Sequence, residues 1–140
     1  MKKRWSKLSQ VSMEYLFVIG FSTLMIIPLL IIYYNYSNEA SDSVATAQAL
    51  QVARKIVDSA ESVYYLGKPS QTTIKVSFPG KISNATLSDK EVFFKIKVKG
   101  GLSDVVFPSS VNITGTLPTS QGIHIITLKA ETSYVQLTSN

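Results

Sequence analysis

The sequence predicts an α+β protein with one long N-terminal α-helix, first transmembrane and then amphipathic, followed by a small antiparallel β-sandwich or meander head. Residues 15–36 are almost continuously apolar or aromatic. Residues 37–66 repeat apolar side chains at steps of three and four, and from residue 72 onward apolar and polar side chains alternate. We therefore expect four segments: a basic N-terminal segment (1–9), a transmembrane helix (10–36), its amphipathic continuation (37–66) and a β-rich head (70–140).

The apolar stretch is long enough to cross a membrane as a helix. About 20 helical residues, rising roughly 1.5 Å each, cover a hydrocarbon core of about 30 Å. No charged residue lies between Glu14 and Glu39, and no basic residue directly follows the stretch. The positive-inside rule then predicts a cytoplasmic N-terminus and an extracellular head. The basic residues before the stretch are Lys2, Lys3, Arg4 and Lys7.

A short motif joins the basic N-terminal segment to the apolar stretch and reads Ser9-Gln10-Val11-Ser12-Met13-Glu14-Tyr15. It resembles the processing site of archaeal type IV pilin-like proteins with a class III signal peptide. In that family the mature chain starts at a Gln, followed by Ser two residues on, Glu two further, an aromatic residue and the apolar helix. Gln10, Ser12, Glu14 and Tyr15 match this pattern, whereas Ser9 stands where the family usually has Gly.

The resemblance implies a function and a set of partners. A prepilin peptidase would cut between Ser9 and Gln10 and leave residues 1–9, the basic leader, in the cytoplasm. The mature chain would be a pilin or minor pilin, a structural subunit of a type IV pilus-like extracellular filament that supports cell adhesion or surface attachment. Its partners would be copies of itself in a homopolymer or mixed filament, membrane lipid before assembly, and, indirectly, the pilus assembly platform and its ATPase.

Three residues of the span are expected to serve assembly: Glu14, Tyr15 and Pro28. Cleavage would create an ammonium group at Gln10, and Glu14 lies one helical turn later on nearly the same face. In pilin-like families the corresponding Glu is thought to pair with the new N-terminus of a neighbouring subunit. Alternatively, Glu14 lies at the headgroup level or serves only peptidase recognition. Pro28 removes one helical hydrogen bond, which predicts a kink or local unwinding.

The net charge of +5 belongs mostly to the leader. Fourteen Lys and Arg, less the four of the leader, leave ten against nine Asp and Glu. The charge is therefore a topology signal, and no nucleic-acid partner is expected. Alternating Lys95, Lys97 and Lys99 indicate the solvated face of a strand.

The amphipathic part of the helix is expected to lay one apolar stripe against the head and to stop at Gly67, with Pro69 beyond it. The stripe consists of Ala40, Val44, Ala47, Leu50, Ala53, Val57, Ala60 and Tyr64. Period-two alternation then predicts strands near residues 72–78, 91–99, 104–107, 110–117, 122–130 and 134–138.

Three N-glycosylation sequons are present, at Asn84, Asn112 and Asn35. Asn84 is expected in a loop and is the best candidate, whereas Asn35 lies close to the membrane. The chain has no cysteine, so neither a disulfide framework nor a thiolate metal site is expected.

The sequence offers little for catalysis, and we expect neither an enzyme nor a cofactor or metal. His124, the one histidine, lies in an apolar strand pattern, and no phosphate-binding loop or paired-histidine motif is present. Two functional classes remain besides the pilin. One is a membrane-anchored extracellular binding module, and the other is a stator-like protein that is not polymerised.

Overall fold

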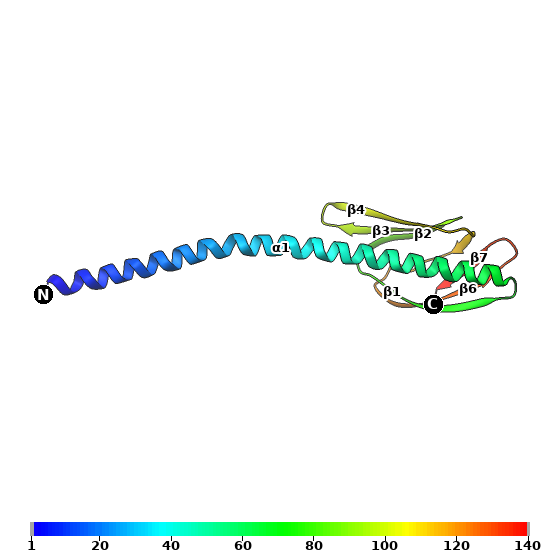
Figure 1. Ribbon diagram of the computed structural model, residues 1–140, viewed down its shortest axis with the longest axis horizontal. Coiled ribbons are helices and arrows are strands. Elements are labelled where there is room, and N and C mark those ends of the chain that lie inside the picture. Colours follow the sequence, from blue (N-terminus) through cyan, green and yellow to red (C-terminus); the bar gives the residue numbers. More distant parts are fainter. Residues whose placement is uncertain (1, 140) are drawn as a thin grey trace. The chain divides into compact units, whose positions relative to one another are not determined.

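The computed structural model describes the backbone of residues 2–139 and the side chains of residues 11–139. Within this range a single helix precedes seven strands (Figure 1). The α+β class is therefore confirmed. The elements are α1 (Lys2–Leu66), β1 (Gln71–Phe78), β2 (Ile82–Ser88), β3 (Glu91–Val98), β4 (Gly101–Pro108), β5 (Ile113–Gly115), β6 (Gly122–Ala130) and β7 (Val135–Ser139). The chain forms two compact units, one ending at Asn38 and the other beginning at Glu39.

The first unit is the apolar part of α1. By length and composition this helix can cross a membrane, which indicates that the protein is membrane-anchored. Every side chain from Val11 to Ser37 is exposed, as expected for a surface that contacts lipid or other helices.

The helix runs through Pro28 without interruption, so the expected local unwinding is not found. Proline removes one N–H from the hydrogen-bond ladder, and the remaining bonds of this 65-residue helix continue on both sides of it. Further along, α1 ends at Leu66 as predicted. Gly67 follows with a φ of 76°, and its N–H donates to the Tyr64 carbonyl.

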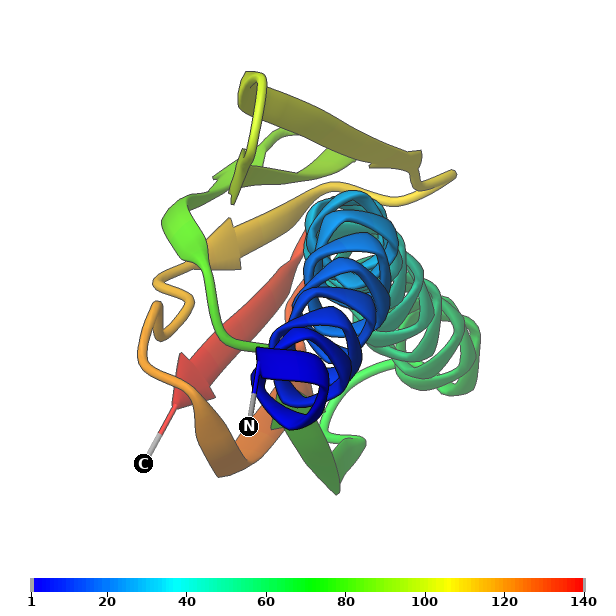
Figure 2. The same ribbon diagram turned by 90° about the vertical axis from the view of Figure 1, so that its left-hand side faces the viewer.

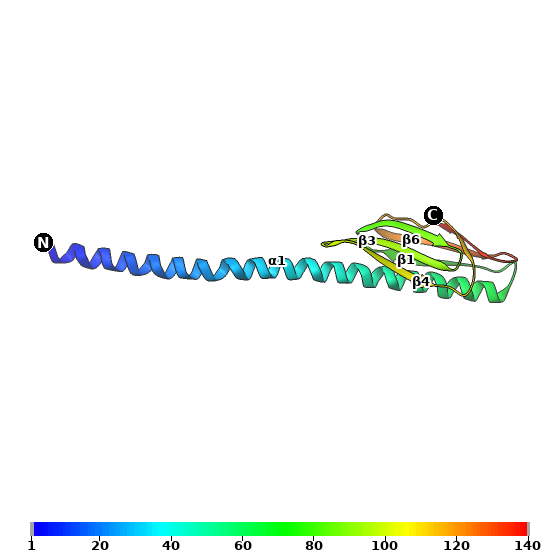
Figure 3. The same ribbon diagram turned by 90° about the horizontal axis from the view of Figure 1, so that it is seen from above.

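The second unit contains two sheets beside the remainder of the helix (Figure 2). One sheet has the strand order β1-β6-β7-β5 and the other the order β2-β3-β4. The strands run lengthwise along residues 39–66 of α1 (Figure 3). All strand pairs are antiparallel except β5 with β7, which is parallel, so the expectation of a purely antiparallel head is wrong for that pair.

Two strand predictions need correction. Strand β2 was not expected, because its sequence is rich in Ser, Asn and Thr and its register shifts between Ile82 and Asn84, which breaks the alternation. Asn84 consequently lies in a strand and not in a loop. The strand expected over 110–117 is reduced to Ile113–Gly115, because Gly115 has a φ of 141° and the chain leaves the sheet there.

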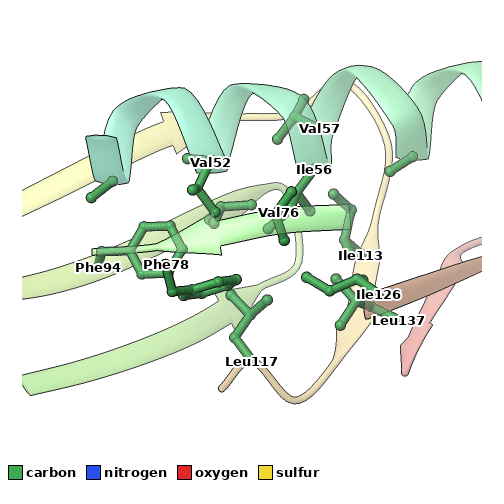
Figure 4. Close-up of a cluster of buried hydrophobic side chains, with 14 of the residues drawn as sticks. Val52, Ile56, Val57, Val76, Phe78, Phe94, Ile113, Leu117, Ile126 and Leu137 are labelled. Atoms are coloured by element: carbon green, nitrogen blue, oxygen red, sulfur yellow. The ribbon is translucent and has the colours of Figure 1, made fainter. Parts of the chain in front are cut away.

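The core lies between the two sheets and one face of the helix (Figure 4). Phe78 of β1 and Phe94 of β3 meet edge to face, with ring centroids 5.8 Å apart, and thereby join the sheets. The fully buried Ile56 comes from the helix. The buried helical residues are Ala45, Ala49, Val52, Ala53, Ile56, Val57, Ala60 and Val63.

The predicted apolar stripe is correct in its second half and wrong in its first half. Ala53, Val57 and Ala60 are buried, whereas the apolar side chains expected at the head before residue 51 are exposed. Ala45 and Ala49 pack on the head in their place. The helix carries two apolar faces in this region, and their periodicity is the same, so the pattern alone does not say which face the head covers. The exposed residues are Ala40, Val44, Ala47 and Leu50.

Candidate assembly surface

The N-terminal motif begins at Ser9 and Gln10, which lie within α1 but whose side chains fall outside the described residues. Ser12, Glu14 and Tyr15 follow in the same helix, all with exposed side chains. Across residues 11–139 the Glu14 carboxylate has no hydrogen-bond or ion-pair partner, although apolar residues surround it in the sequence. A carboxylate at the edge of an apolar helix is costly to bury, and it is usually hydrated at the headgroup level or paired with a positive group.

The helix places Gln10 and Glu14 one turn apart. Four residues at about 1.5 Å each separate them by roughly 6 Å along the axis and about 40° around it. A charged amino group at position 10 would therefore lie on the same side of the helix as the carboxylate. Two neighbouring helices offset by about one turn could join these groups as an ion pair.

In the second unit, residues 39–50 of α1 carry the exposed apolar residues Ala40, Val44, Ala47 and Leu50, here called the outer helix face. At about 100° per residue, Ala40, Val44 and Ala47 point away from the side that packs on the sheets. Val44 is 54% exposed and Leu50 is 39% exposed. The small residues on this face would allow another helix to approach closely.

Polar contacts hold the helix on the head while leaving the outer helix face open. Asp42 accepts hydrogen bonds from Lys81 Nζ and from the Lys99 backbone N–H, each at 2.8 Å. Lys81 Nζ also donates to Ser41 Oγ at 2.9 Å. The bond from Lys81, followed by that from Lys99, lowers the pKa of Asp42 below its ordinary value of 3.8.

A second carboxylate binds the far end of the helix to the loop after β4. Glu61 Oε1 accepts from Ser110 Oγ at 2.6 Å and from the Ser110 backbone N–H at 2.9 Å. These two bonds lower the pKa of Glu61 from its ordinary value of 4.5. Between the two carboxylates, the Arg54 guanidinium lies 5.6 Å from the centroid of the Phe107 ring.

These carboxylates predict acid-sensitive docking of the helix. Because the folded pKa values of Asp42 and Glu61 are lowered, their stabilisation is present above the unfolded values and is lost as pH falls through the folded ones. We expect the urea midpoint of the full-length protein in detergent to be flat from pH 7 to about 5 and to fall below about pH 4.5.

The matched control for that prediction is the double variant Asp42→Asn, Glu61→Gln. It should unfold at lower urea at pH 7 and show a shallower loss of stability in acid than the natural chain. An unchanged acid slope in the double variant would show that other groups cause the loss.

The Asn residues of the three sequons lie in different structural environments. Asn84 is exposed on β2 opposite Lys95, so it stays the best candidate for a glycan. Asn112 is half-buried, and its carbonyl accepts a 2.8 Å bond from the Val135 N–H. Asn35 lies in the apolar part of α1.

The residues with catalytic or metal-binding chemistry are dispersed. The Nε2 atom of His124 lies 2.9 Å from the Ser120 carbonyl oxygen, and its ring packs edge to face on Phe78. In the part of the chain that the structure describes, no three His, Asp or Glu side chains gather in a group that could hold a metal ion.

The docking residues Asp42, Lys81, Glu61 and Ser110 were not singled out from the sequence. They are separated by 39 to 49 positions, and no local pattern marks a pair that only the tertiary fold brings together. Lys81 has a φ of 72°, which follows from the turn before β2 and is likewise invisible in the sequence pattern.

Comparison of the chain with protein-family models, with curated proteins and with solved structures gives no match. The function is therefore inferred from the motif, the helix and the surfaces described above.

Proposed function

We propose that this chain is a structural subunit, a pilin or minor pilin, of an archaeal type IV pilus-like surface filament. It is processed by a prepilin peptidase between Ser9 and Gln10 and assembles through its N-terminal helix. The observation that carries the proposal is the outer helix face, whose apolar residues Ala40, Val44, Ala47 and Leu50 are exposed beyond the membrane segment. A simple anchor needs no apolar surface there, whereas a helix that packs against its own copies does.

The N-terminal motif supports the same proposal. A plain membrane anchor does not need the Glu14 carboxylate. Removing this charge from water without a partner costs free energy. The amino group exposed by cleavage at Gln10 is a partner of the right charge, and the helical spacing allows the two groups of neighbouring subunits to meet.

Assembly then proceeds from membrane to filament. The precursor waits with its leader in the cytoplasm and its head outside, in contact with lipid along α1. After trimming and extraction, helices exchange lipid for one another. Close packing of helices drives this exchange, because leaving lipid by itself gains no hydrophobic free energy. The heads form the outer wall, where adhesion and any glycan on Asn84 would be displayed.

The outer helix face provides the test. Replacement of Ala47 by Glu is expected to reduce filament yield at least about tenfold, because a charge would be buried unpaired in the helix contact. Gln48→Glu is the matched control, since it adds the same charge at the next residue, about 100° around the helix. Electron microscopy and sheared-filament yield measure assembly, and membrane fractionation confirms insertion. Normal filaments from Ala47→Glu would contradict the role of this face.

One residue favours an alternative. Ser9 replaces the Gly usual before the cleavage site, which fits an uncleaved, membrane-anchored binding module or stator-like protein that does not polymerise. In that case the protein in native membranes keeps its leader.

A further inference from the structure

The two sheets of the head have unpaired outer strands on either side of the helix. β1 is an outer strand of the four-stranded sheet, and β4 is an outer strand of the three-stranded sheet. The remaining outer strands, β2 and β5, contact each other and so close the opposite side of the head. Figure 2 shows the helix between β1 below and β4 above. Unpaired outer strands present backbone groups that another strand can bind.

The backbone groups at the β1 edge can be identified from one hydrogen bond. Lys55 Nζ donates to the Lys75 carbonyl at 2.8 Å, so that carbonyl points away from the neighbouring strand β6. Because these directions alternate along a strand, Thr73, Lys75 and Ser77 all present N–H and C=O groups at the free edge. A cavity of about 320 Å³ adjoins this edge between the helix and β1, and Lys75 and Ser77 are among the residues that line it.

The direction of the backbone N–H and C=O groups of β4 follows from the hydrogen bonds of its partner β3. Lys97 N–H donates to the Lys81 carbonyl, so Lys97 and, by alternation, Lys95 direct their backbone groups toward β2. Asp104 lies opposite Lys95 in an unbroken register. Asp104 therefore directs its own N–H and C=O away from β3. Leu102 and Val106 also direct their N–H and C=O groups away from β3, so all three residues present backbone groups at the free edge of β4.

We propose that β1 of one copy pairs antiparallel with β4 of a neighbouring copy. With Lys75 opposite Asp104, the two strands, each of eight residues, overlap completely. Pro108, which has no N–H, falls at the terminal pair with Gln71. The outward side chains then match as Thr73 with Val106, Lys75 with Asp104 and Ser77 with Leu102.

Charge selects this partner. Lys75, at the middle of the β1 edge, discourages pairing with most strands, as lysines on edge strands commonly do. Asp104 is the acidic residue that the matching register places opposite it. Lys55 caps the Lys75 carbonyl in the single chain, and pairing would release its ammonium group next to Asp104.

The direction of the strands suits a filament. β1 runs back from the end of the head at which α1 stops, and β4 runs toward that end (Figure 1). Antiparallel pairing therefore places two heads side by side with the same orientation. The contact joins two different edges, so it can repeat from copy to copy. This inference rests on the proposed function for what gathers the copies, and it adds a specific contact between their heads.

Engineered cysteines provide the test, since the natural chain has none. The double variant Thr73→Cys, Val106→Cys places both thiols at one outward pair, where Cα atoms lie about 5.5 Å apart and a disulfide can form. Mild oxidation of the full chain in native membranes and filaments should give a ladder of covalent multimers. Each single variant, and the mismatched pair Thr73→Cys, Leu102→Cys, should give no ladder, because the mismatch separates the thiols by roughly 14 Å.

Charge reversal adds a second readout. Lys75→Asp in the cysteine pair should lower the multimer yield at least about tenfold, and adding Asp104→Lys should restore it. Filaments that form without a ladder would overturn the edge pairing and leave the proposed function intact. A ladder in membranes that contain no filaments would support the pairing and contradict the filament. Absence of both would overturn both.

Discussion

Replacement of Gly115 by Ala is expected to destabilise the head by about 3–5 kcal/mol. Gly115 ends β5 with a φ of 141°, a conformation that L side chains rarely adopt. A Cβ at this position would also overlap the backbone carbonyl of Leu137 on β7. Since backbone cannot move aside as a flexible side chain can, the parallel β5–β7 pair would have to open.

Gly122 is the matched control for this prediction. It has nearly the same φ, 136°, but a Cβ there would meet nothing within 4 Å. Gly122→Ala should therefore lower the free energy of unfolding only by the cost of the positive φ, about 1–2 kcal/mol. The midpoint of urea unfolding, followed by circular dichroism of the full chain in detergent, measures both. Equal losses would show that the approach of β7 does not determine the effect.

Replacement of Glu14 by Gln should lower filament yield at least about a hundredfold, while membrane insertion stays normal. The change keeps the size of the side chain and removes the charge that would pair with the amino group of Gln10 in a neighbour. Loss of an ion pair in an apolar surrounding leaves the remaining charge unpaired, which costs about 3–5 kcal/mol. Glu39→Gln is the control, because it neutralises the next carboxylate along the chain, beyond the apolar span.

Two readouts separate pairing from peptidase recognition in this variant. If Glu14 acts in pairing, the processed chain accumulates in the membrane without filaments. If Glu14 serves only recognition, the precursor accumulates instead. Normal filament yield from processed Glu14→Gln would contradict the pairing.

The sequence predicts those parts of the fold that depend on local patterns. The apolar length of the span, the helix stop at Gly67 and most strands follow from composition, turn residues and period. The side of the helix that faces the head does not follow, because Ala45 and Val44 belong to two apolar faces of similar periodicity. Strand β2 was missed because a shift of register hides its alternation.

The candidate surfaces likewise include some residues that the sequence reveals and others that only the fold reveals. Glu14 and its spacing from Gln10 can be read from seven consecutive residues. The Asp42–Lys81 and Glu61–Ser110 contacts join distant segments, so only the folded chain reveals them. The match between Lys75 and Asp104 also depends on knowing which strands are outermost and which way their backbone groups point.

The most direct measurement is the N-terminus of the native protein, obtained by intact mass and terminal peptide mapping of membranes and shed filaments. A chain that begins at Gln10, present in both fractions, is the result we predict for a processed filament subunit. A chain that begins at Met1 or Lys2 and is confined to the membrane would contradict the processing and leave an anchored, unpolymerised module.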